Sequence, residues 1–323
     1  MRRRVFVTLI GGAAVQWALA ARAQQPAIGF LSPGSPESDV VRLAGLRQGL
    51  KESGYVEDQN VAIEYRFAHG QNDSLPALAA DLVDRRMAGL VTAGSAATLA
   101  AKAATATVPI VFSVGVDPVQ FGLAASLSRP GGNLTGVTVL SADLAAKRLE
   151  VLHELLPDAA VVAMLVNPAN PTVEPDSRAT QDAARSLGVQ LHVLRASTAG
   201  EIDAAFASLV KLRARALVLD IDGYFVNQSA QIIALGARYA VPTIAGWRDF
   251  AVAGGLMSYG SDLADIYRQS GLYAGKILKG SQPADLPVQQ VVKIEMVVNL
   301  KTAKTLGITF PLPLIGRADE VIE

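Results

Sequence analysis

The sequence predicts an α/β protein of two Rossmann-like lobes, each with a parallel sheet, joined by a hinge that the chain crosses three times. Short apolar runs alternate with amphipathic helical segments through most of the chain, with brief turns between them. This alternation is typical of parallel sheets with right-handed crossovers. It begins afresh after Thr138, and a chain of 323 residues suits two domains better than one core.

The first lobe is expected to alternate four strands with three helices. The strands are apolar or alternating runs at 27–31, 61–67, 90–93 and 109–113. The helices have apolar residues at helical spacing and lie at 38–52, at 75–87 and from 94 onward. After the fourth strand we expect an open loop with Asp117, then a short helix, a glycine pair and a second apolar run that ends at Thr138.

The second lobe repeats this order. Its strands are expected at 161–166, 190–194, 216–219 and 241–245, and its helices at 144–156, 177–187, 201–213 and 228–239. Then follow a short apolar run at 256–259, a long helix at 262–278, a strand at 288–299 and a final helix at 300–306. With crossings near Thr138, Phe250 and Pro283, the first lobe comprises 24–138 and about 250–282, and the second comprises 139–249 and about 283–323.

The first residues form an export signal. Three arginines, an apolar segment and the small-x-small end Ala21-Arg22-Ala23 predict a secretory signal peptide over 1–23, cleaved after about Ala23. The run from Arg3 to Leu9 also resembles a twin-arginine signal, so the twin-arginine and Sec routes both stay open. The apolar segment is shorter than the roughly 20 residues that span a bilayer. We therefore expect an exported, periplasmic protein.

Charge and cysteine content exclude several classes of partner and site. Basic and acidic residues number 29 each, and removal of the signal takes away four arginines and no acid. This balance gives no reason to expect nucleic acid as a partner. The chain has no cysteine, which excludes disulfides, thiolate metal sites, a cysteine nucleophile and a lipid-modified cysteine.

No motif predicts a cofactor or a catalytic centre. The first strand is not followed by GxGxxG, GxxxxGK[ST] is absent, and Gly94-Ser95 lacks the GxSxG pattern. His69, His153 and His192 fall in separate segments without metal-ligand spacing. We therefore expect no cofactor, no metal and no enzymatic activity.

Small polar residues, carboxamides and aromatic residues recur just past the predicted strands, where open parallel sheets bind ligands. The candidate ligand-binding residues are Ser32, Gly94, Ser95, Ser113 and Asp117 in the first lobe and Asn167, Asn170, Asp222, Tyr224 and Trp247 in the second.

Four of these residues have a functional and a structural interpretation. The helix that begins near Gly94 offers free amides to a carboxylate, and Ser95 could add a hydroxyl donor or simply cap the helix. Asp117 and Asp222 could bind a ligand amine or hydroxyls, or could form turns, because a proline and a glycine follow them. An aromatic residue after a strand, such as Trp247, either stacks on a ligand or packs in the core.

Several segments resemble a known family. They are IGFLSPGSP at the first strand, the pattern DPVxxGLxxSLxxPGGNxTG over 117–136, the long helix from Asp262, and the tail NLKTAKTLGITFP with RADEVIE. Together they are similar to the exported substrate-binding proteins of ABC importers, in particular the group that includes the tryptophan- and tyrosine-binding components of bacteria.

The resemblance implies a type I periplasmic-binding fold, two lobes that close on a small molecule, and an ABC permease in the inner membrane as partner. It places Gly94, Ser95, Ser113 and Asp117 on one wall of the cleft, and Asn167 and Asp222 on the other. We expect a monomer. An exported sensor that presents its ligand to a membrane receptor is the alternative, and an enzyme on the same fold is a more remote one.

The chain departs from the amino-acid binders at the loop that follows the strand at 216–219. Those proteins have Asp-Asn-Thr there, whereas this chain has Asp-Gly-Tyr-Phe from Asp222. The expected ligand is therefore stated only as a small polar organic molecule, either an amino acid or an aromatic or carboxylate-bearing compound.

Overall fold

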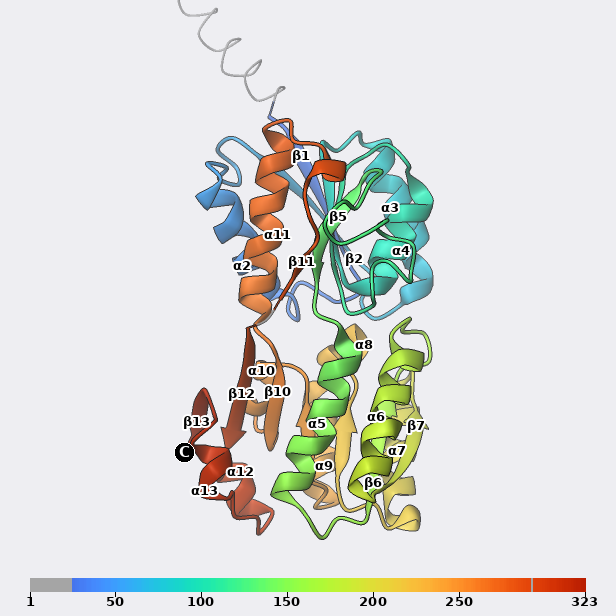
Figure 1. Ribbon diagram of the computed structural model, residues 1–323, viewed down its shortest axis with the longest axis vertical. Helices are drawn as coiled ribbons and strands as arrows, with labels where there is room; N and C mark the ends of the chain where they lie inside the picture. The colour runs from blue at the N-terminus through green and yellow to red at the C-terminus, as the bar shows by residue number, and fades with distance from the viewer. Residues whose placement is uncertain (1–24, 292) are drawn as a thin grey trace, which may run out of the picture.

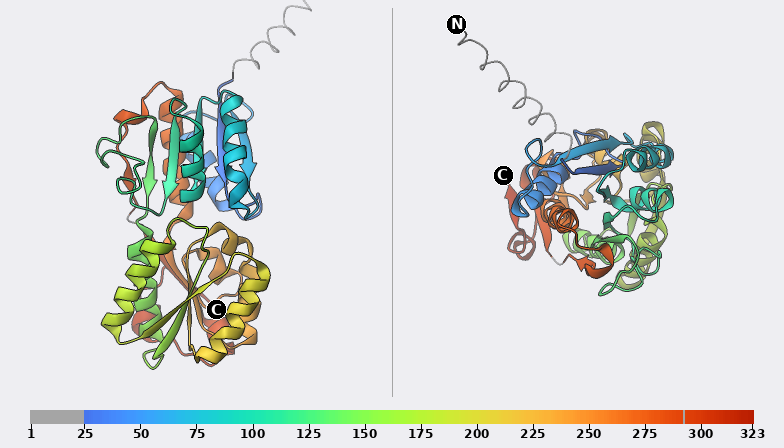
Figure 2. Two further views of the ribbon diagram at one scale, coloured as in Figure 1. Left: turned by 90° about the vertical axis from the view of Figure 1, so that its right-hand side faces the viewer. Right: turned by 90° about the horizontal axis from the view of Figure 1, so that it is seen from above.

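The computed structural model describes residues 25–291 and 293–323. Two lobes are stacked along the long axis of the molecule (Figure 1), and a view from the side shows them as separate bodies (Figure 2). The expected signal peptide lies outside the described residues. Among the residues that are described, no helix is both long enough and apolar enough to cross a membrane.

The first lobe is built on a six-stranded parallel sheet. Its strands are β1 (Ala27–Ser32), β2 (Ala62–Phe67), β3 (Gly89–Ala93), β4 (Ile110–Val114), β5 (Leu134–Thr138) and β11 (Gln289–Gln290), in the order β11-β5-β4-β3-β1-β2. β1 shows why the sheet is buried on both faces. Ile28 and Phe30 belong to one core cluster, and Leu31 belongs to the cluster on the opposite face.

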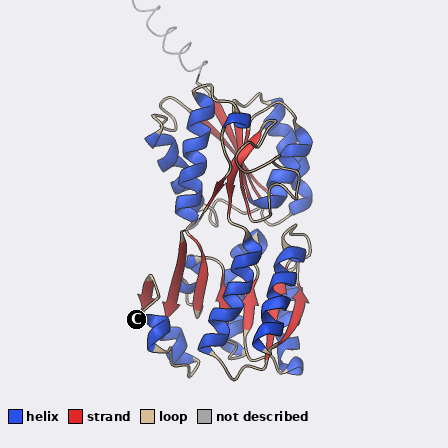
Figure 3. Ribbon diagram, viewed as in Figure 1, coloured by secondary structure: helices blue, strands red, loops and turns tan. Residues whose placement is uncertain are grey.

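Helices cover both faces of this sheet (Figure 3). α2 (Val40–Glu52) and α11 (Leu263–Leu278) pack on one face, where Leu46 and Ala274 share a core cluster with Phe30. α3 (Leu75–Asp84) and α4 (Gly94–Ala104) pack on the other. The 3-10 turns η1 (Asn72–Ser74) and η2 (Pro283–Asp285) complete the lobe. The short helix expected after Asp117 is absent from the described residues, because 118–123 form successive turns.

The second lobe contains a seven-stranded sheet. Its strands are β6 (Val161–Val166), β7 (Gln190–Arg195), β8 (Leu217–Leu219), β9 (Thr243–Ala245), β10 (Met257–Ser261), β12 (Ile294–Asn299) and β13 (Glu320–Ile322), in the order β13-β12-β10-β9-β8-β6-β7. All neighbouring strands are parallel except β10 and β12, which are antiparallel.

Eight helices accompany this sheet in the described chain. They are α5 (Ser141–Leu155), α6 (Val173–Leu187), α7 (Ala199–Leu212), α8 (Gly223–Asn227), α9 (Ser229–Arg238), α10 (Arg248–Val252), α12 (Leu300–Thr305) and α13 (Leu312–Ile315). α5 and α6 share one core cluster with the sheet, and α7 and α9 share the cluster on the opposite face. Local sequence sets the helix ends. α7, for example, starts with a capping box between Thr198 and Glu201.

The two lobes have the same strand topology. The order β2-β1-β3-β4-β5 in the first lobe corresponds to β7-β6-β8-β9-β10 in the second. In each lobe the second strand is added on one side of the first strand, and all later strands of this series are added on its other side. The order in which strands are added therefore reverses once, beside β1 in the first lobe and beside β6 in the second. Ligands in such sheets bind beyond the carboxyl ends of the strands at that switch point. The fold therefore directs the loops after β1, β3 and β4 toward the loops after β6 and β8.

The chain crosses between the lobes three times, as predicted, but the positions predicted for the second and third crossings are wrong. Because β10 pairs with β9 and β12, the second crossing follows Ser261 rather than Phe250. Because β11 pairs with β5, the third follows Gln290 rather than Pro283. The strand expected at 288–299 extends across the third crossing and is in fact two strands, β11 and β12, in different sheets, so its alternating pattern does not mark where the chain changes lobe.

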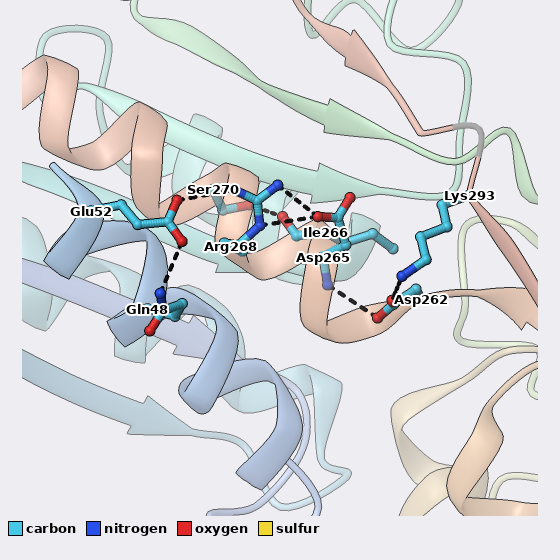
Figure 4. Close-up of polar contacts among 8 residues, drawn as sticks. All are labelled: Gln48, Glu52, Asp262, Asp265, Ile266, Arg268, Ser270 and Lys293. Atoms are coloured by element: carbon cyan, nitrogen blue, oxygen red, sulfur yellow. Dashed lines mark hydrogen bonds and ion pairs between the residues drawn. The ribbon is translucent and has the colours of Figure 1, made fainter.

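The second and third crossings are tied together. Lys293 Nζ donates to Asp262 Oδ2 at 2.7 Å, and Asp262 Oδ1 accepts from the backbone N–H of Asp265 as the N-cap of α11 (Figure 4). The same view shows Arg268 of α11 between Asp265 and Glu52 of α2. The hinge is thus anchored to the helix pair that covers the first lobe.

α2 and α11 approach so closely that glycine is required between them. A methyl group added to Gly49 would lie 1.9 Å from the carbonyl oxygen of Arg268. We expect Gly49→Ala to push the helices apart and to lower the free energy of unfolding by about 1–3 kcal/mol, as overpacking does. Urea denaturation measures the loss.

Gly200→Ala is the matched control for this prediction. Gly200 is also a helical glycine, but a methyl group there would meet no atom within 4 Å. Its substitution should leave stability unchanged or slightly raised. Equal unfolding midpoints for both variants would contradict the close packing of α2 on α11.

Candidate functional site

A cavity of about 130 Å³ lies between the two lobes, where their switch points face each other. Cavities of roughly 150 Å³ accommodate a molecule as large as benzene, so this one has room for a small organic compound. Residues of both lobes form its wall: Ser32, Pro33, Gly34, Arg42, Asn72, Ala93, Gly94, Ser95, Ala96, Ser113, Val114, Gly115, Val139, Leu263, Ile266 and Tyr267 on the first-lobe side, and Ser141, Asn170, Thr172, Ile221, Asp222 and Gly223 on the second.

The first lobe presents a helix N-terminus to the cavity. Gly94 opens α4 with a φ of 83°, a left-handed conformation that favours glycine, and none of the side chains that the structure describes caps this end. The first amides of a helix have no intrahelical partner. Ser95 Oγ is buried and has no hydrogen-bond partner among the described residues. Backbone amides and one hydroxyl therefore converge where an anionic group would be stabilised.

A buried ion pair stands on the same wall. Arg42 Nη1 donates to Asp39 Oδ1 at 2.5 Å, and its guanidinium lies 5.9 Å from the ring centre of Tyr267. Burial raises the pKa of Tyr267 to about 12, so its phenol stays neutral at physiological pH. Ser113, at the end of β4, is within hydrogen-bond distance of Ser270 on α11, 2.9 Å away. This part of the wall is fixed by its own contacts.

The second lobe contributes a carboxylate. Asp222 Oδ1 accepts from Asn167 Nδ2 at 2.8 Å and from the Tyr224 amide at 2.9 Å, which caps α8. Burial raises the pKa of Asp222, although these hydrogen bonds act in the opposite direction. Asn170 Nδ2 donates to the carbonyl oxygen of Ile221 and steadies the loop. The Asp222 carboxylate faces the cavity with its position set by neighbours.

The lobes touch around the cavity, so the molecule is in a closed form. A methyl group on Gly223 would lie 3.2 Å from Pro33 of the first lobe, and one on Gly70 would lie 2.9 Å from Tyr224. At the hinge side, Ser141 donates to the carbonyl oxygen of Gly115 from its backbone N–H at 2.8 Å and from Oγ at 3.0 Å.

Six of the ten residues predicted from the sequence line the cavity, namely Ser32, Gly94, Ser95, Ser113, Asn170 and Asp222. The structure does not bring the other four to its wall. Asp117 Oδ1 instead accepts from the amides of Val119 and Gln120 in its own turn. Asn167 lies behind Asp222 and orients it.

The two predicted aromatic residues also lie away from the wall. Trp247 is 3% exposed and packs edge-to-face on Phe250, 5.6 Å between ring centres, so it belongs to the core. Tyr224 lies against Gly70 of the first lobe. An aromatic residue after a strand buries as much apolar surface inside as on a ligand, which is why the sequence did not separate these outcomes.

Sequence reasoning missed five polar residues of the wall: Arg42, Asn72, Ser141, Thr172 and Tyr267. Ser141 opens α5 and Thr172 precedes α6, so helix-start signals could have indicated them. Arg42 and Tyr267 lie within helices α2 and α11, and only tertiary packing turns them toward the cavity. In the described part of the chain, no group of three or more His, Cys, Asp or Glu side chains could hold a metal ion.

Known proteins match this chain over most of its length. The family model described as ABC transporter substrate binding protein matches residues 32–322. A tyrosine-binding protein of Clostridioides difficile is 27% identical over 265 residues, which cover 81% of this chain and 75% of that protein.

Solved structures share the fold. A conserved domain protein from Vibrio cholerae superposes with a TM-score of 0.86 at 25% identity, covering 92% of this chain and all of that one. An ABC domain from Streptococcus pneumonia in complex with L-Trp superposes with a TM-score of 0.85 at 24% identity, covering 93% of this chain and all of that one. The superpositions support, for this chain, the two-lobed type I periplasmic-binding fold that the resemblance implies.

Proposed function

The chain belongs to the ABC transporter substrate binding protein family, and we propose that it is the extracytoplasmic solute-binding component of an importer, which delivers a small polar organic molecule to a membrane permease. One observation carries the proposal. A cavity of molecular size lies between two lobes, and each lobe supplies a polar group suited to one end of a ligand, the α4 N-terminus with Ser95 and the Asp222 carboxylate.

The ligand class follows from these two polar groups, the α4 N-terminus with Ser95 and the Asp222 carboxylate. Helix amides and a hydroxyl stabilise a carboxylate, and a buried carboxylate pairs with an ammonium group or with hydroxyls. Apolar side chains of the wall, among them Val114, Ile221 and Ile266, would cover a hydrocarbon portion. An amino acid, or another carboxylate-bearing compound with donors at its far end, meets all three requirements.

The mechanism is closure of the hinge. A ligand held by one lobe alone makes half of its contacts, and only the closed form adds those of the other, so the ligand shifts the population toward that form. The permease then recognises the closed shape. Binding without chemistry is part of the proposal, in keeping with a family of substrate-binding proteins.

Export completes the proposal. The arginine-rich start, the apolar segment and Ala21-Arg22-Ala23 support secretion into the periplasm with cleavage after about Ala23. We propose a monomer whose partners are the small ligand and the inner-membrane permease.

A thermal-shift screen tests the binding function. Purified mature protein is heated with each of the L-amino acids and with a set of aromatic and aliphatic carboxylic acids. A ligand should raise the Tm in proportion to the logarithm of its concentration over its Kd, and should be recovered unchanged. Turnover of any compound, or no stabilisation by any carboxylate, would count against the proposal.

Ser95→Ala tests whether the α4 N-terminus binds the carboxylate of the ligand. A hydrogen bond to a charged group contributes about 1.5–3 kcal/mol, so affinity for the ligand found in the screen should fall by roughly 10- to 150-fold. Stability should hold or rise, since Ser95 Oγ has no partner within the described residues. Isothermal titration calorimetry gives both affinities. Ser186→Ala, on an exposed part of α6, is the control and should bind like the wild type.

A further inference from the structure

Three charged side chains are buried together beneath the second-lobe wall of the cavity. Arg148 comes from α5, Asp176 from α6 and Asp220 follows β8, and all three are 0% exposed. Arg148 Nη2 lies 4.0 Å from Asp220 Oδ1, and the Asp176 and Asp220 carboxyl groups are within hydrogen-bonding reach of each other. Ile221 and Thr172, which neighbour this cluster in the chain, line the cavity itself.

The cluster contains one positive group and two acidic ones, so it is neutral only when it also holds a proton. An unbalanced charge without water costs several kcal/mol. The hydrogen bonds within the cluster also lack a proton donor between the two acids. Among the described residues, Asp176 Oδ2 and Asp220 Oδ2 have no donor, and the Arg148 nitrogens have no acceptor at hydrogen-bond distance. A proton on one carboxyl would supply the missing donor between the acids.

Other charges nearby do not remove this need. The remaining ionisable residues of α6 (Glu174, Arg178, Asp182 and Arg185) are exposed, and those of α5 (Asp143, Lys147, Glu150, His153 and Glu154) are exposed or half-buried. Asp222, in the loop after β8, adds a further negative charge. Burial, the first cause, and the neighbouring carboxylates raise the pKa of Asp220 well above 3.8, and burial raises the pKa of Asp176.

One hydroxyl connects this cluster to the contact between the lobes. Ser141 Oγ lies 2.8 Å from Asp176 Oδ1 and 3.0 Å from the carbonyl oxygen of Gly115 in the first lobe. A hydroxyl has a single hydrogen, so it can serve only one of these acceptors fully. An ionised Asp176 attracts it strongly, because charge-assisted hydrogen bonds are about twice as strong as neutral ones. A neutral Asp176 leaves it free for Gly115.

We propose that Asp176 and Asp220 form a proton-binding site, and that the bound proton turns the Ser141 hydroxyl toward Gly115 and thereby favours the closed form. The proton comes from solvent and forms one O–H bond on the carboxyl pair. Closure then weakens as pH rises and the site loses its proton. The inference concerns the protein without ligand, so it can be tested without knowing which ligand binds.

The free energy of unfolding should depend on pH because the folded protein binds this proton. The folded chain binds it more tightly than the unfolded chain does, so the free energy of unfolding falls as pH rises above about 3.8 and levels off once the folded pKa is passed. Asp176→Asn and Asp220→Asn each leave one acid opposite Arg148, and each should remove this slope. The double variant leaves Arg148 without a counterion and should raise the unfolding equilibrium constant by at least about 100-fold.

Measuring the fraction of closed molecules distinguishes a cluster that controls closure from one that only stabilises the fold. Because the chain has no cysteine, Val119→Cys and Val210→Cys on exposed positions of the two lobes accept spin labels without background. Asp176→Asn makes the acceptor neutral, so the closed fraction should stay high at all pH values. Asp220→Asn keeps Asp176 ionised beside Arg148, so the closed fraction should stay low.

In the wild type, the ratio of closed to open molecules should fall by about fivefold as the pH rises through the raised pKa of the carboxyl pair, which corresponds to the difference between a charge-assisted and a neutral hydrogen bond. Asp182→Asn, on the exposed part of α6, is the control and should follow the wild type. The same direction of shift in both cluster variants, or a wild-type slope in either, would overturn the proposal. The infrared band of a protonated carboxyl should disappear over the same pH range in the wild type and should be absent in both variants, which provides a readout that needs no unfolding.

Discussion

Asp222→Asn should lower the affinity for the ligand by roughly 30- to 5,000-fold while the protein stays folded. Truncating one partner of a buried charge pair costs about 2–5 kcal/mol of binding free energy. Asparagine caps helices as well as aspartate does, so α8 keeps its first hydrogen bond. Because burial raises the pKa of Asp222, removal of its charge should not lower stability at neutral pH. Calorimetric titration and a melting curve measure the two quantities.

Asp117→Asn is the matched control. Asp117 is also an acid just past a strand, but its carboxylate accepts hydrogen bonds within its own turn and does not line the cavity. Its substitution should leave affinity within about twofold of the wild type, because surface substitutions have small effects. If Asp117→Asn weakened binding as much as Asp222→Asn did, the assignment of the cavity as the binding site would be wrong.

Gly115→Val should abolish closure and reduce affinity more than 100-fold. A methyl group at this position would lie 2.9 Å from Ser141 Cβ and Oγ and 3.3 Å from Thr172 Cγ2, so a valine side chain cannot fit between the closed lobes. The open form lacks this crowding on the second-lobe side and should persist. A ligand that cannot bring the second lobe into contact loses the contribution of Asp222 and its neighbours.

Distances between the labels on the two lobes, measured with and without ligand, provide the readout. The variant should show the long distance in both conditions. Gly115→Ala should give a partial defect, because the single added methyl group would lie 2.9 Å from Ser141 Cβ and Oγ. Closure of Gly115→Val on ligand would show that this contact does not govern the movement.

Much of the site was predictable because the fold class fixes where loops converge. Ser32, Ser95, Ser113 and Asp222 each lie at or just after the end of a strand that the apolar pattern marks, and parallel sheets present such positions at one edge. Asp117 has the same local pattern but turns back on its own loop. The pattern alone does not distinguish a carboxylate that faces a ligand from one that caps a turn.

The sequence by itself determined the two α/β lobes, most of their strands and helices, and several polar residues of the wall near strand ends, because hydrophobic periodicity and helix-end residues act over a few neighbouring positions. Only the tertiary structure decided which residues far apart in the chain share one space. Arg42 and Tyr267 reach the cavity from helices that pack side by side, and Arg148, Asp176 and Asp220 meet from three elements of the second lobe. Burial and charge coupling between such residues depend on how the lobes pack, which no local pattern records.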